Sequence, residues 1–215
     1  MITYTGQRIE PLSKFDGKFN GVPNIIDIAL GLSRMARFGG QTRRWWSVLL
    51  HSIVCYKIAE THCYETDLDI NMDKVLMLCL LHDSHEAITA DVPAFFKTPE
   101  LKQHQQDLDE RFFGSLGLWP VSRVEEDFIK WVDDEALRAE ALLVGPPTIM
   151  QHLSYPLSNS EDIVKGVMAK YPDCSSSEGL DSRAVREFLD IFAGLYRSVA
   201  KDTCDDTPSN QKEKK

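Results

Sequence analysis

The segment on which the interpretation of this chain depends reads Val75-Leu76-Met77-Leu78-Cys79-Leu80-Leu81-His82-Asp83-Ser84-His85-Glu86. The adjacent His82 and Asp83 offer one imidazole nitrogen and one carboxylate oxygen to the same point in space, which suits a divalent cation of borderline hardness. Glu86 follows four residues after His82, so on a continuous helix it lies on the same face. A carboxylate there can orient or deprotonate a water held by the metal. The segment therefore predicts a metal-dependent hydrolase.

Hydrophobic periodicity predicts an all-α fold around this segment. One helix is expected beyond Pro23-Asn24 and ends at Gly39-Gly40. Further helices are expected at about 47–60, 71–87, 99–116, 125–144, 160–169 and 181–200. The first two dozen residues read as irregular or extended, with a small hairpin turning at Thr5-Gly6-Gln7. A loop is expected from Gly145 to about Asn159.

Length and composition indicate a single domain. A chain of 215 residues can bury a substantial core, and 43% hydrophobic with 27% charged residues is ordinary for a globular protein. We expect one domain over residues 1–200 and a disordered polar tail over 201–215. The net charge of −9 argues against a protein that coats duplex nucleic acid.

Targeting signals and cysteine usage favour a soluble cytoplasmic protein. The N-terminus has no basic and apolar pattern of a secretory signal, and no apolar run approaches the roughly 18 residues of a membrane span. The five cysteines are scattered without a Cys-x-x-Cys pair, which suits buried thiols in a reducing compartment.

A metal site needs at least two ligands besides His82 and Asp83. His51 is the first candidate, because its neighbours at helical spacing are apolar and the imidazole therefore points inward. A core histidine with a polar partner is the alternative reading of His51 taken alone. The presence of the His-Asp pair elsewhere in the chain favours the ligand.

The fourth ligand is expected from Asp133-Asp134. Asp133 shares the apolar stripe of its helix, whereas Asp134 lies four residues from both Lys130 and Arg138 and reads as a solvated ion-pairing position. A carboxylate that faces the core is costly unless it is paired or metal-bound. The helical phase therefore selects Asp133.

Two residues near the His-Asp pair are harder to assign. Asp91 follows after a short turn, where it can reach a second cation or hold a water, or can equally cap the next helix ahead of Pro93. His85 is expected to form a hydrogen bond or to be exposed.

A basic segment precedes His51. Between Asp27 and Glu60 there is no acidic residue, and the interval carries Arg34, Arg37, Arg43, Arg44 and Lys57. Arginine suits phosphate oxygens, and the aromatic residues Phe38, Trp45 and Trp46 can stack on a base. A solvated loop without a ligand is the alternative. Metal, arginines and aromatics together suggest a phosphoester substrate, a nucleotide above all.

The order His51, His82-Asp83, Asp133 resembles that of the HD-domain phosphohydrolases. The string from Leu81 to Pro93 resembles the LHDxxEaxxgDxP motif of one branch, which includes small 5′-deoxynucleotidases and a phage dATP triphosphohydrolase. The likeness covers roughly residues 3 to 145. It implies that these four residues bind the metal, that Glu86 and Asp91 are catalytic, and that Arg37 holds phosphate. The resemblance also implies that residues 1–200 form a helical HD-type domain.

The resemblance also implies an activity. The expected enzyme cleaves the 5′ phosphoester of a deoxynucleoside monophosphate with Mn, Co, Zn or Fe, with an additional Mg as an option. The alternatives are a deoxynucleoside triphosphohydrolase that releases triphosphate, and a catalytically silent nucleotide-binding protein. Family members are usually dimers or larger rings, so a homo-oligomer is expected, with no membrane partner. Gln41 and Leu50 depart from the family pattern near the presumed substrate side.

Overall fold

The computed structural model describes residues 2–7, 24–63, 70–146, 148, 160–172 and 182–205. Its elements in chain order are α1 (Ile25–Ser33), η2 (Arg37–Gly40), α2 (Val48–His62), α3 (Met72–Leu81), α4 (Glu86–Thr89), η4 (Ala94–Phe96), α5 (Pro99–Ser115), α6 (Arg123–Leu143), α7 (Glu161–Lys170) and α8 (Arg183–Asp205). The described residues contain no β-strand, and Ala36 and Ser47 pair as an isolated antiparallel bridge. The predicted all-α fold is confirmed.

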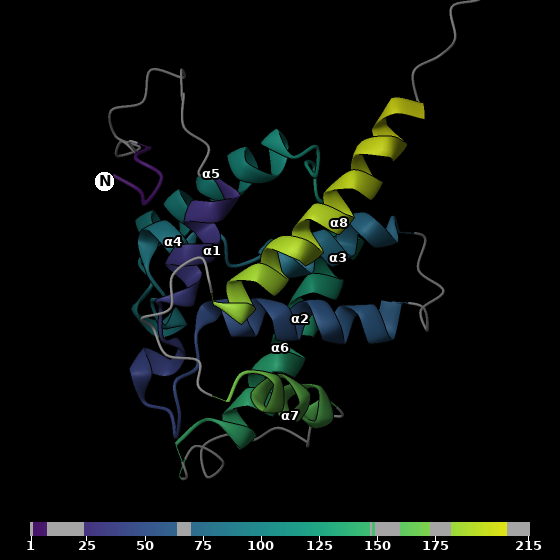
Figure 1. Cartoon of the computed structure of the whole chain (residues 1–215). Helices are drawn as coiled ribbons and strands as arrows, with labels where there is room; N and C mark the ends of the chain where they lie inside the picture. Colours follow the sequence, from purple (N-terminus) through teal and green to yellow (C-terminus); the bar gives the residue numbers. More distant parts are fainter. Residues whose placement is uncertain are drawn as a thin grey trace, which may run out of the picture.

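Helix α2 forms the centre of the bundle. It packs against α1, α3, α6, α7 and α8, and α8 crosses the front of α2 and α3 (Figure 1). Helices α2 and α3 are apolar on nearly all sides, so most of their residues are completely buried. A polar side chain in the buried part of either helix, such as His51, therefore faces other helices rather than water. None of the helices in the described ranges is long and apolar enough to cross a membrane.

Short side chains cap the helices where the sequence predicts their starts. Asn24, Ser47, Asn71, Thr98 and Ser122 each accept a hydrogen bond from a backbone N–H of the helix that follows. The cap of α6 is a full capping box with its third helical residue, a glutamate. These caps fix where each helix begins, and the start of α2 carries His51 of the candidate site.

The first predicted helix is shorter than expected. It ends at Ser33 rather than at Gly39-Gly40, because the chain turns at Arg34 and pairs back on the segment before α2. The Arg37 backbone N–H donates to Trp46 O at 2.9 Å, and the Val48 N–H donates to Met35 O at 3.0 Å. This pairing ends α1, so Arg37 lies at the start of η2, beside the start of α2.

The third predicted helix also ends early, at Leu81 rather than near Ala87. The Ser84 backbone N–H donates to Leu81 O at 2.9 Å, and the Ser84 hydroxyl donates to the same oxygen. Because one carbonyl takes both donors, the chain turns tightly over 82–85 before α4 begins at Glu86. Glu86 is therefore placed by this turn, and not by helical spacing from His82.

The two ends of the chain are described in part. Thr3 and Gly6 close a turn, and Thr5 donates from its N–H and its hydroxyl to Asp27 at 2.8 and 2.6 Å. The second arm of the predicted N-terminal hairpin lies outside the described residues, as does most of the loop expected up to Asn159. Helix α8 continues to Asp205, beyond its predicted end at Ala200, and the rest of the expected tail lies outside the described residues.

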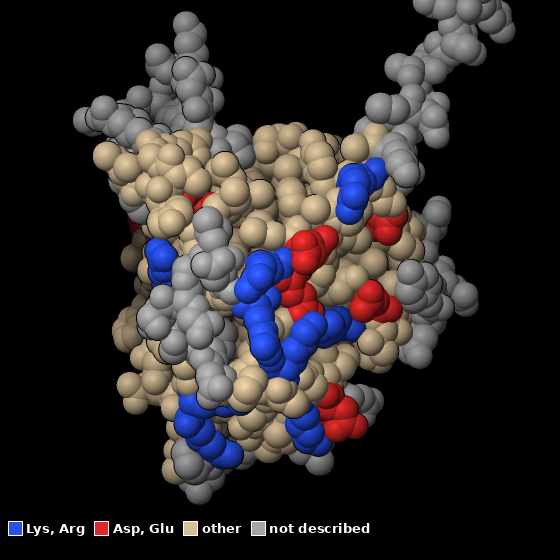
Figure 2. All heavy atoms as spheres, viewed as in Figure 1, with Lys and Arg blue, Asp and Glu red and all other residues tan. Residues whose placement is uncertain are grey.

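The surface carries charges of both signs close together. On the face shown in Figure 2, blue Lys and Arg side chains lie beside red Asp and Glu side chains. Interhelical ion pairs contribute to this mixture: Glu187 of α8 pairs with Lys57 of α2 at 3.5 Å and with Lys170 of α7 at 2.5 Å. Ion pairs at the surface contribute little to stability, but they mean that this face has no uniform electrostatic field.

Candidate metal centre

Three helices bring the predicted ligands together. His51 lies in the first turn of α2 and is completely buried. His82 is the C-cap of α3, and Asp83 follows it in the turn. Asp133 lies on α6, with its carboxylate turned towards both imidazoles. The helix end matters, because adjacent residues on a continuous helix point about 100° apart, whereas here both side chains reach the same point.

The donor atoms of these residues lie within a few ångströms of one another. His51 Nε2 is 3.2 Å from His82 Nε2, 3.5 Å from Asp83 Oδ2 and 3.1 Å from Asp133 Oδ1. His82 Nε2 is 3.3 Å from Asp83 Oδ2 and 3.7 Å from Asp133 Oδ1. These separations are close to those between ligands that surround one cation at about 2.0–2.2 Å.

The hydrogen bonds of the outer ring nitrogens fix the tautomers of both imidazoles. His51 Nδ1 donates to the Glu140 carboxylate at 3.1 Å, and His82 Nδ1 donates to Cys79 O at 2.9 Å. Both acceptors carry no hydrogen, so each Nδ1 must hold the proton. In the neutral rings the two Nε2 lone pairs then face each other and two carboxylate oxygens. This arrangement is repulsive unless a positive charge lies between the donors, so the residues fit a divalent cation.

The pKa values show the same concentration of negative charge. Burial lowers the pKa of His82, but the Asp83 and Asp133 carboxylates outweigh it and raise that pKa well above its usual range. Burial and Arg37 lower the pKa of His51, and Glu140 and Asp133 raise it overall. Burial raises the pKa values of both aspartates, but the two imidazoles hold them well below the usual range. The site therefore attracts either protons or a metal ion.

Of the two neighbouring aspartates of α6, Asp133 is the one that lies beside both imidazoles. Asp133 faces His51 and His82, as the helical phase predicts. Asp134 is half-buried, and Arg138, its predicted partner, pairs with Glu135. The ligand role of Asp133 stays a prediction.

Glu140 is a site residue that the sequence analysis missed. It is completely buried, and Oε2 lies 3.1 Å from Arg37 Nε. Burial raises the Glu140 pKa, but His51 and Arg37 lower it overall, so the carboxylate is ionised. Arg37 also lies 3.5 Å from Asp83 Oδ2, in this case through Nη1. One buried guanidinium therefore links the carboxylate behind His51 to a predicted metal ligand.

Cys55 was also missed as a neighbour of the site. It lies four residues after His51 on α2, and its Sγ is 3.5 Å from His51 Nε2. With His51, His82 and Asp133 it forms a group of side chains that could hold a metal ion. Burial, and then Asp133 and Glu140, raise the pKa of this thiol well above its usual value. Cys55 therefore contacts the imidazole of His51 and is one of the possible donors of the site.

The two predicted catalytic carboxylates lie near Asp83. Glu86 is buried, its Oε2 has no hydrogen-bond partner, and its Oε1 is 3.7 Å from Lys97 Nζ. Burial, and then Asp83 and Asp91, raise the pKa of Glu86 to about 8. Asp91 is half-buried, and burial raises its pKa overall although Arg37 lowers it. Both carboxylates thus belong to the same electrostatic neighbourhood as the metal ligands.

His85 forms a hydrogen bond, as expected. Its Nδ1 lies 2.9 Å from the Asp109 carboxylate of α5, and its Nε2 is buried without a partner. This contact ties the turn after α3 to α5 and so holds the position of Glu86, the next residue.

Of the predicted substrate contacts, Arg44 and Trp46 do not face the site. The Arg44 guanidinium donates to Tyr171 O at 2.5 Å and Pro172 O at 3.1 Å, so it caps the end of α7. Trp46 is completely buried in the core, where a nucleotide base cannot reach it. Arg43 is exposed, and its backbone N–H donates to Val144 O. Phe38 is half-buried under the Arg37 guanidinium, 5.6 Å from Cζ to the ring centroid.

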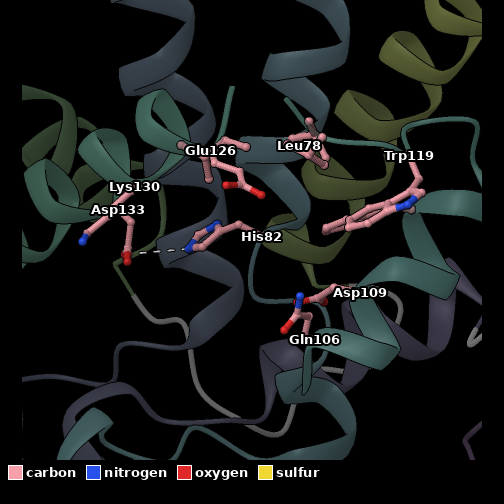
Figure 3. A pocket seen from close by; sticks show the side chains of 11 residues that line it. Leu78, His82, Gln106, Asp109, Trp119, Glu126, Lys130 and Asp133 are labelled. Atoms are coloured by element: carbon pink, nitrogen blue, oxygen red, sulfur yellow. Dashed lines mark ion pairs between the residues drawn. The ribbon is translucent and has the colours of Figure 1, made fainter. Parts of the chain in front are cut away.

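A cavity of about 380 Å³ opens beside the predicted ligands. Figure 3 shows His82 and Asp133 at one side of it, with Trp119 across from them and Gln106 and Asp109 along the edge formed by α5. Its size falls in the usual range of small-molecule sites, roughly 300–1,000 Å³. Two of the four predicted ligands, His82 and Asp133, therefore belong to the lining of the cavity.

The chain is similar to a curated bacterial protein. Over 100 residues it is 30% identical to the protein described as "Uncharacterized protein YfdR" of Escherichia coli (strain K12). The match covers 45% of this chain and 49% of the relative, so the chain spans about half the length of the curated protein it matches. No protein-family model matches the sequence. The relationship assigns no activity.

Proposed function

We propose that this protein is a metal-dependent phosphoester hydrolase of the HD-domain type. The observation that carries the proposal is the convergence of His51, His82, Asp83 and Asp133, whose donor atoms face one another with both imidazole tautomers fixed. These residues would hold a divalent transition metal such as Mn, Co, Zn or Fe. Such an ion, when bound, supplies a Lewis acid that polarises a phosphoryl oxygen and activates water.

The chain's own residues have separate tasks in this proposal. Arg37 places a buried positive charge against Asp83, where it would hold a phosphate next to the ligands. Glu86 has an unpartnered buried oxygen close to Asp83, so it would move the proton to or from the reacting oxygens. Asp91 would assist from the same neighbourhood. A purely structural metal site has no need of an acid–base carboxylate beside it, and this argues against a silent binding protein.

The proposed substrate is a 5′-deoxynucleoside monophosphate, hydrolysed to deoxynucleoside and phosphate. The resemblance of residues 81–93 to the deoxynucleotidase branch supports it. A deoxynucleoside triphosphate is the alternative, and it would need positive charge beyond the first phosphate. Arg44, a predicted phosphate contact, is instead bound at the end of α7. Because Arg44 does not face the site, it supplies no positive charge for further phosphates, and this favours the monophosphate.

A nucleotide panel tests the proposal. Deoxynucleoside mono- and triphosphates are incubated with the protein and Mn²⁺, Co²⁺, Zn²⁺ or Mg²⁺, and phosphate, pyrophosphate and triphosphate are measured separately. We expect phosphate from monophosphates with a transition metal, and none from the His82→Ala variant. A metal-loaded protein that releases no phosphate species from any nucleotide would contradict the proposal.

A further inference from the structure

The cavity beside the metal ligands has a lining suited to a flat aromatic group. Leu78, Phe113, Val121 and Ile129 supply apolar walls, and Trp119 supplies an indole that is 42% exposed although large apolar side chains are usually buried. The indole faces the interior of the cavity across from Asp133 (Figure 3). An exposed indole on an apolar floor is a stacking platform for a planar ring.

The polar groups of the cavity exclude a chain of phosphates there. Apart from the metal ligands, the charged lining residues are Asp109, Glu126 and Lys130, so carboxylates outnumber the single ammonium group. Asp109 is further engaged by His85. A polyphosphate would be repelled, whereas a neutral group is accepted. Gln106 stands at the edge with a carboxamide that can both donate and accept a hydrogen bond.

The position of the cavity indicates which part of a substrate would bind there. His82 and Asp133 belong to its lining, so a phosphate at the metal ligands has the rest of its molecule directly at the cavity mouth. The basic segment before α2 does not provide a stacking site for the base, because Trp46 is buried in the core.

We propose that this cavity is the nucleoside subsite, with Trp119 stacking on the base and Gln106 contacting the base edge. The inference rests on the proposed function, because it takes the phosphate to lie at the metal ligands. Trp119 would then determine affinity for the base and leave the chemistry at the phosphate unchanged.

Binding of deoxyadenosine and turnover of two phosphoesters test the subsite. Deoxyadenosine is titrated calorimetrically into metal-loaded protein, and hydrolysis of dAMP is compared with that of 2-deoxyribose 5-phosphate, which has no base. Trp119→Ala should weaken deoxyadenosine by roughly 5- to 150-fold, as expected for one stacked base. It should raise KM for dAMP similarly and leave 2-deoxyribose 5-phosphate unchanged. Trp119→Phe should restore most of the binding.

Trp131→Ala is the matched control. Trp131 is 40% exposed and packs against His62 and Phe128, outside the cavity. It should bind deoxyadenosine as the unmodified protein does. Equal binding by Trp119→Ala and the unmodified protein, or equal losses in the two alanine variants, would overturn the subsite. If Trp119→Ala does not fold, Gln106→Ala at the exposed edge replaces it, with the same expected weakening and the same contradicting result.

The two proposals fail separately. Deoxyadenosine binding that depends on Trp119, in a protein that hydrolyses no nucleotide, supports the subsite and refutes the hydrolase. Hydrolysis of dAMP that is indifferent to Trp119 and Gln106 supports the hydrolase and refutes the subsite.

Discussion

His51 Nδ1 donates to the Glu140 carboxylate at 3.1 Å, and both side chains are completely buried. The bond turns the Nε2 lone pair of His51 towards the other donors, and the same carboxylate neutralises the guanidinium of Arg37. A carboxylate behind a metal-binding histidine fixes its tautomer and raises its basicity. Glu140 therefore affects both the stability of the fold, through Arg37, and the orientation of a predicted metal ligand, His51.

Removal of Glu140 should lower both metal affinity and stability. In Glu140→Gln we expect metal affinity to fall by about 10- to 100-fold, because the tautomer of His51 is no longer fixed by a carboxylate. Glu140→Ala should cost about 3–5 kcal/mol of unfolding free energy, because Arg37 keeps a buried charge with fewer partners. Metal titration and urea unfolding measure the two effects.

The double variant Arg37→Met/Glu140→Gln controls for the pair. It should lose less stability than the sum of the two single changes, because no unpaired charge remains. Additive losses in the single and double variants would show that the two side chains act independently.

The folded-state pKa of Glu140 is lowered, so the contribution of this carboxylate to the unfolding free energy is complete well above pH 4.5 and is lost as the pH falls below that value.

Glu86→Gln should separate catalysis from metal binding. Glu86 lies beside the ligands without belonging to the group around His51, so we expect metal content and fold to persist while kcat falls by roughly 10²- to 10⁴-fold. Steady-state kinetics with metal analysis of the same preparation checks this. Unchanged turnover with metal in place would remove Glu86 from the catalytic residues.

Gly31 positions α4, and therefore Glu86, through close contact. A Cβ on Gly31 would lie 2.9 Å from Ala87 Cβ and 3.2 Å from Ala87 Cα, so Gly31→Ala must push α4 away from α1. A displacement of this kind should lower kcat by roughly 10- to 100-fold. Gly166→Ala is the control, because nothing lies within 4 Å of the added carbon in α7. It should keep full activity and gain about 0.5–1 kcal/mol. Equal kinetics for both variants would contradict the positioning role.

Ala90 has a backbone conformation that favours glycine. Its φ of 69° and ψ of 159° at the end of α4 lie in a region that costs an L-residue about 1–3 kcal/mol. Ala90→Gly should therefore raise the unfolding free energy by about 1 kcal/mol. Ala169→Gly, at an exposed helical position of α7, should lower it by about 0.5–1 kcal/mol. Urea unfolding measures both changes, and a loss of stability in Ala90→Gly would contradict the strain.

The sequence predicts the helices and the facing ligands because their signals are local. Periodicity and caps determine where helices start, and helical phase distinguishes Asp133 from Asp134. The same reasoning applies to Glu140, seven residues after Asp133 in the same apolar stripe, and a core-facing carboxylate there indicates a partner.

Other features depend on contacts between distant segments. The early end of α3 comes from a Ser84 hydroxyl bound to Leu81 O, and serine also occurs inside helices. Trp46 reads as a stacking residue beside the arginines, but the packing of the core around α2 buries it. Arg44 caps a helix more than a hundred residues later in the chain. Such long-range partners leave no local pattern.

The most direct test of the metal centre is the metal content of two neighbouring variants. Asp133→Asn and Asp134→Asn are loaded with Mn²⁺ or Co²⁺, desalted and analysed by mass spectrometry, with the unmodified protein alongside. We predict about one ion per chain for the unmodified protein and for Asp134→Asn, which should lose at most about 1 kcal/mol of stability. Asp133→Asn should lose the ion, because one of the few donors of the site is gone. Full metal content in a folded Asp133→Asn, or loss in Asp134→Asn alone, would contradict the assignment.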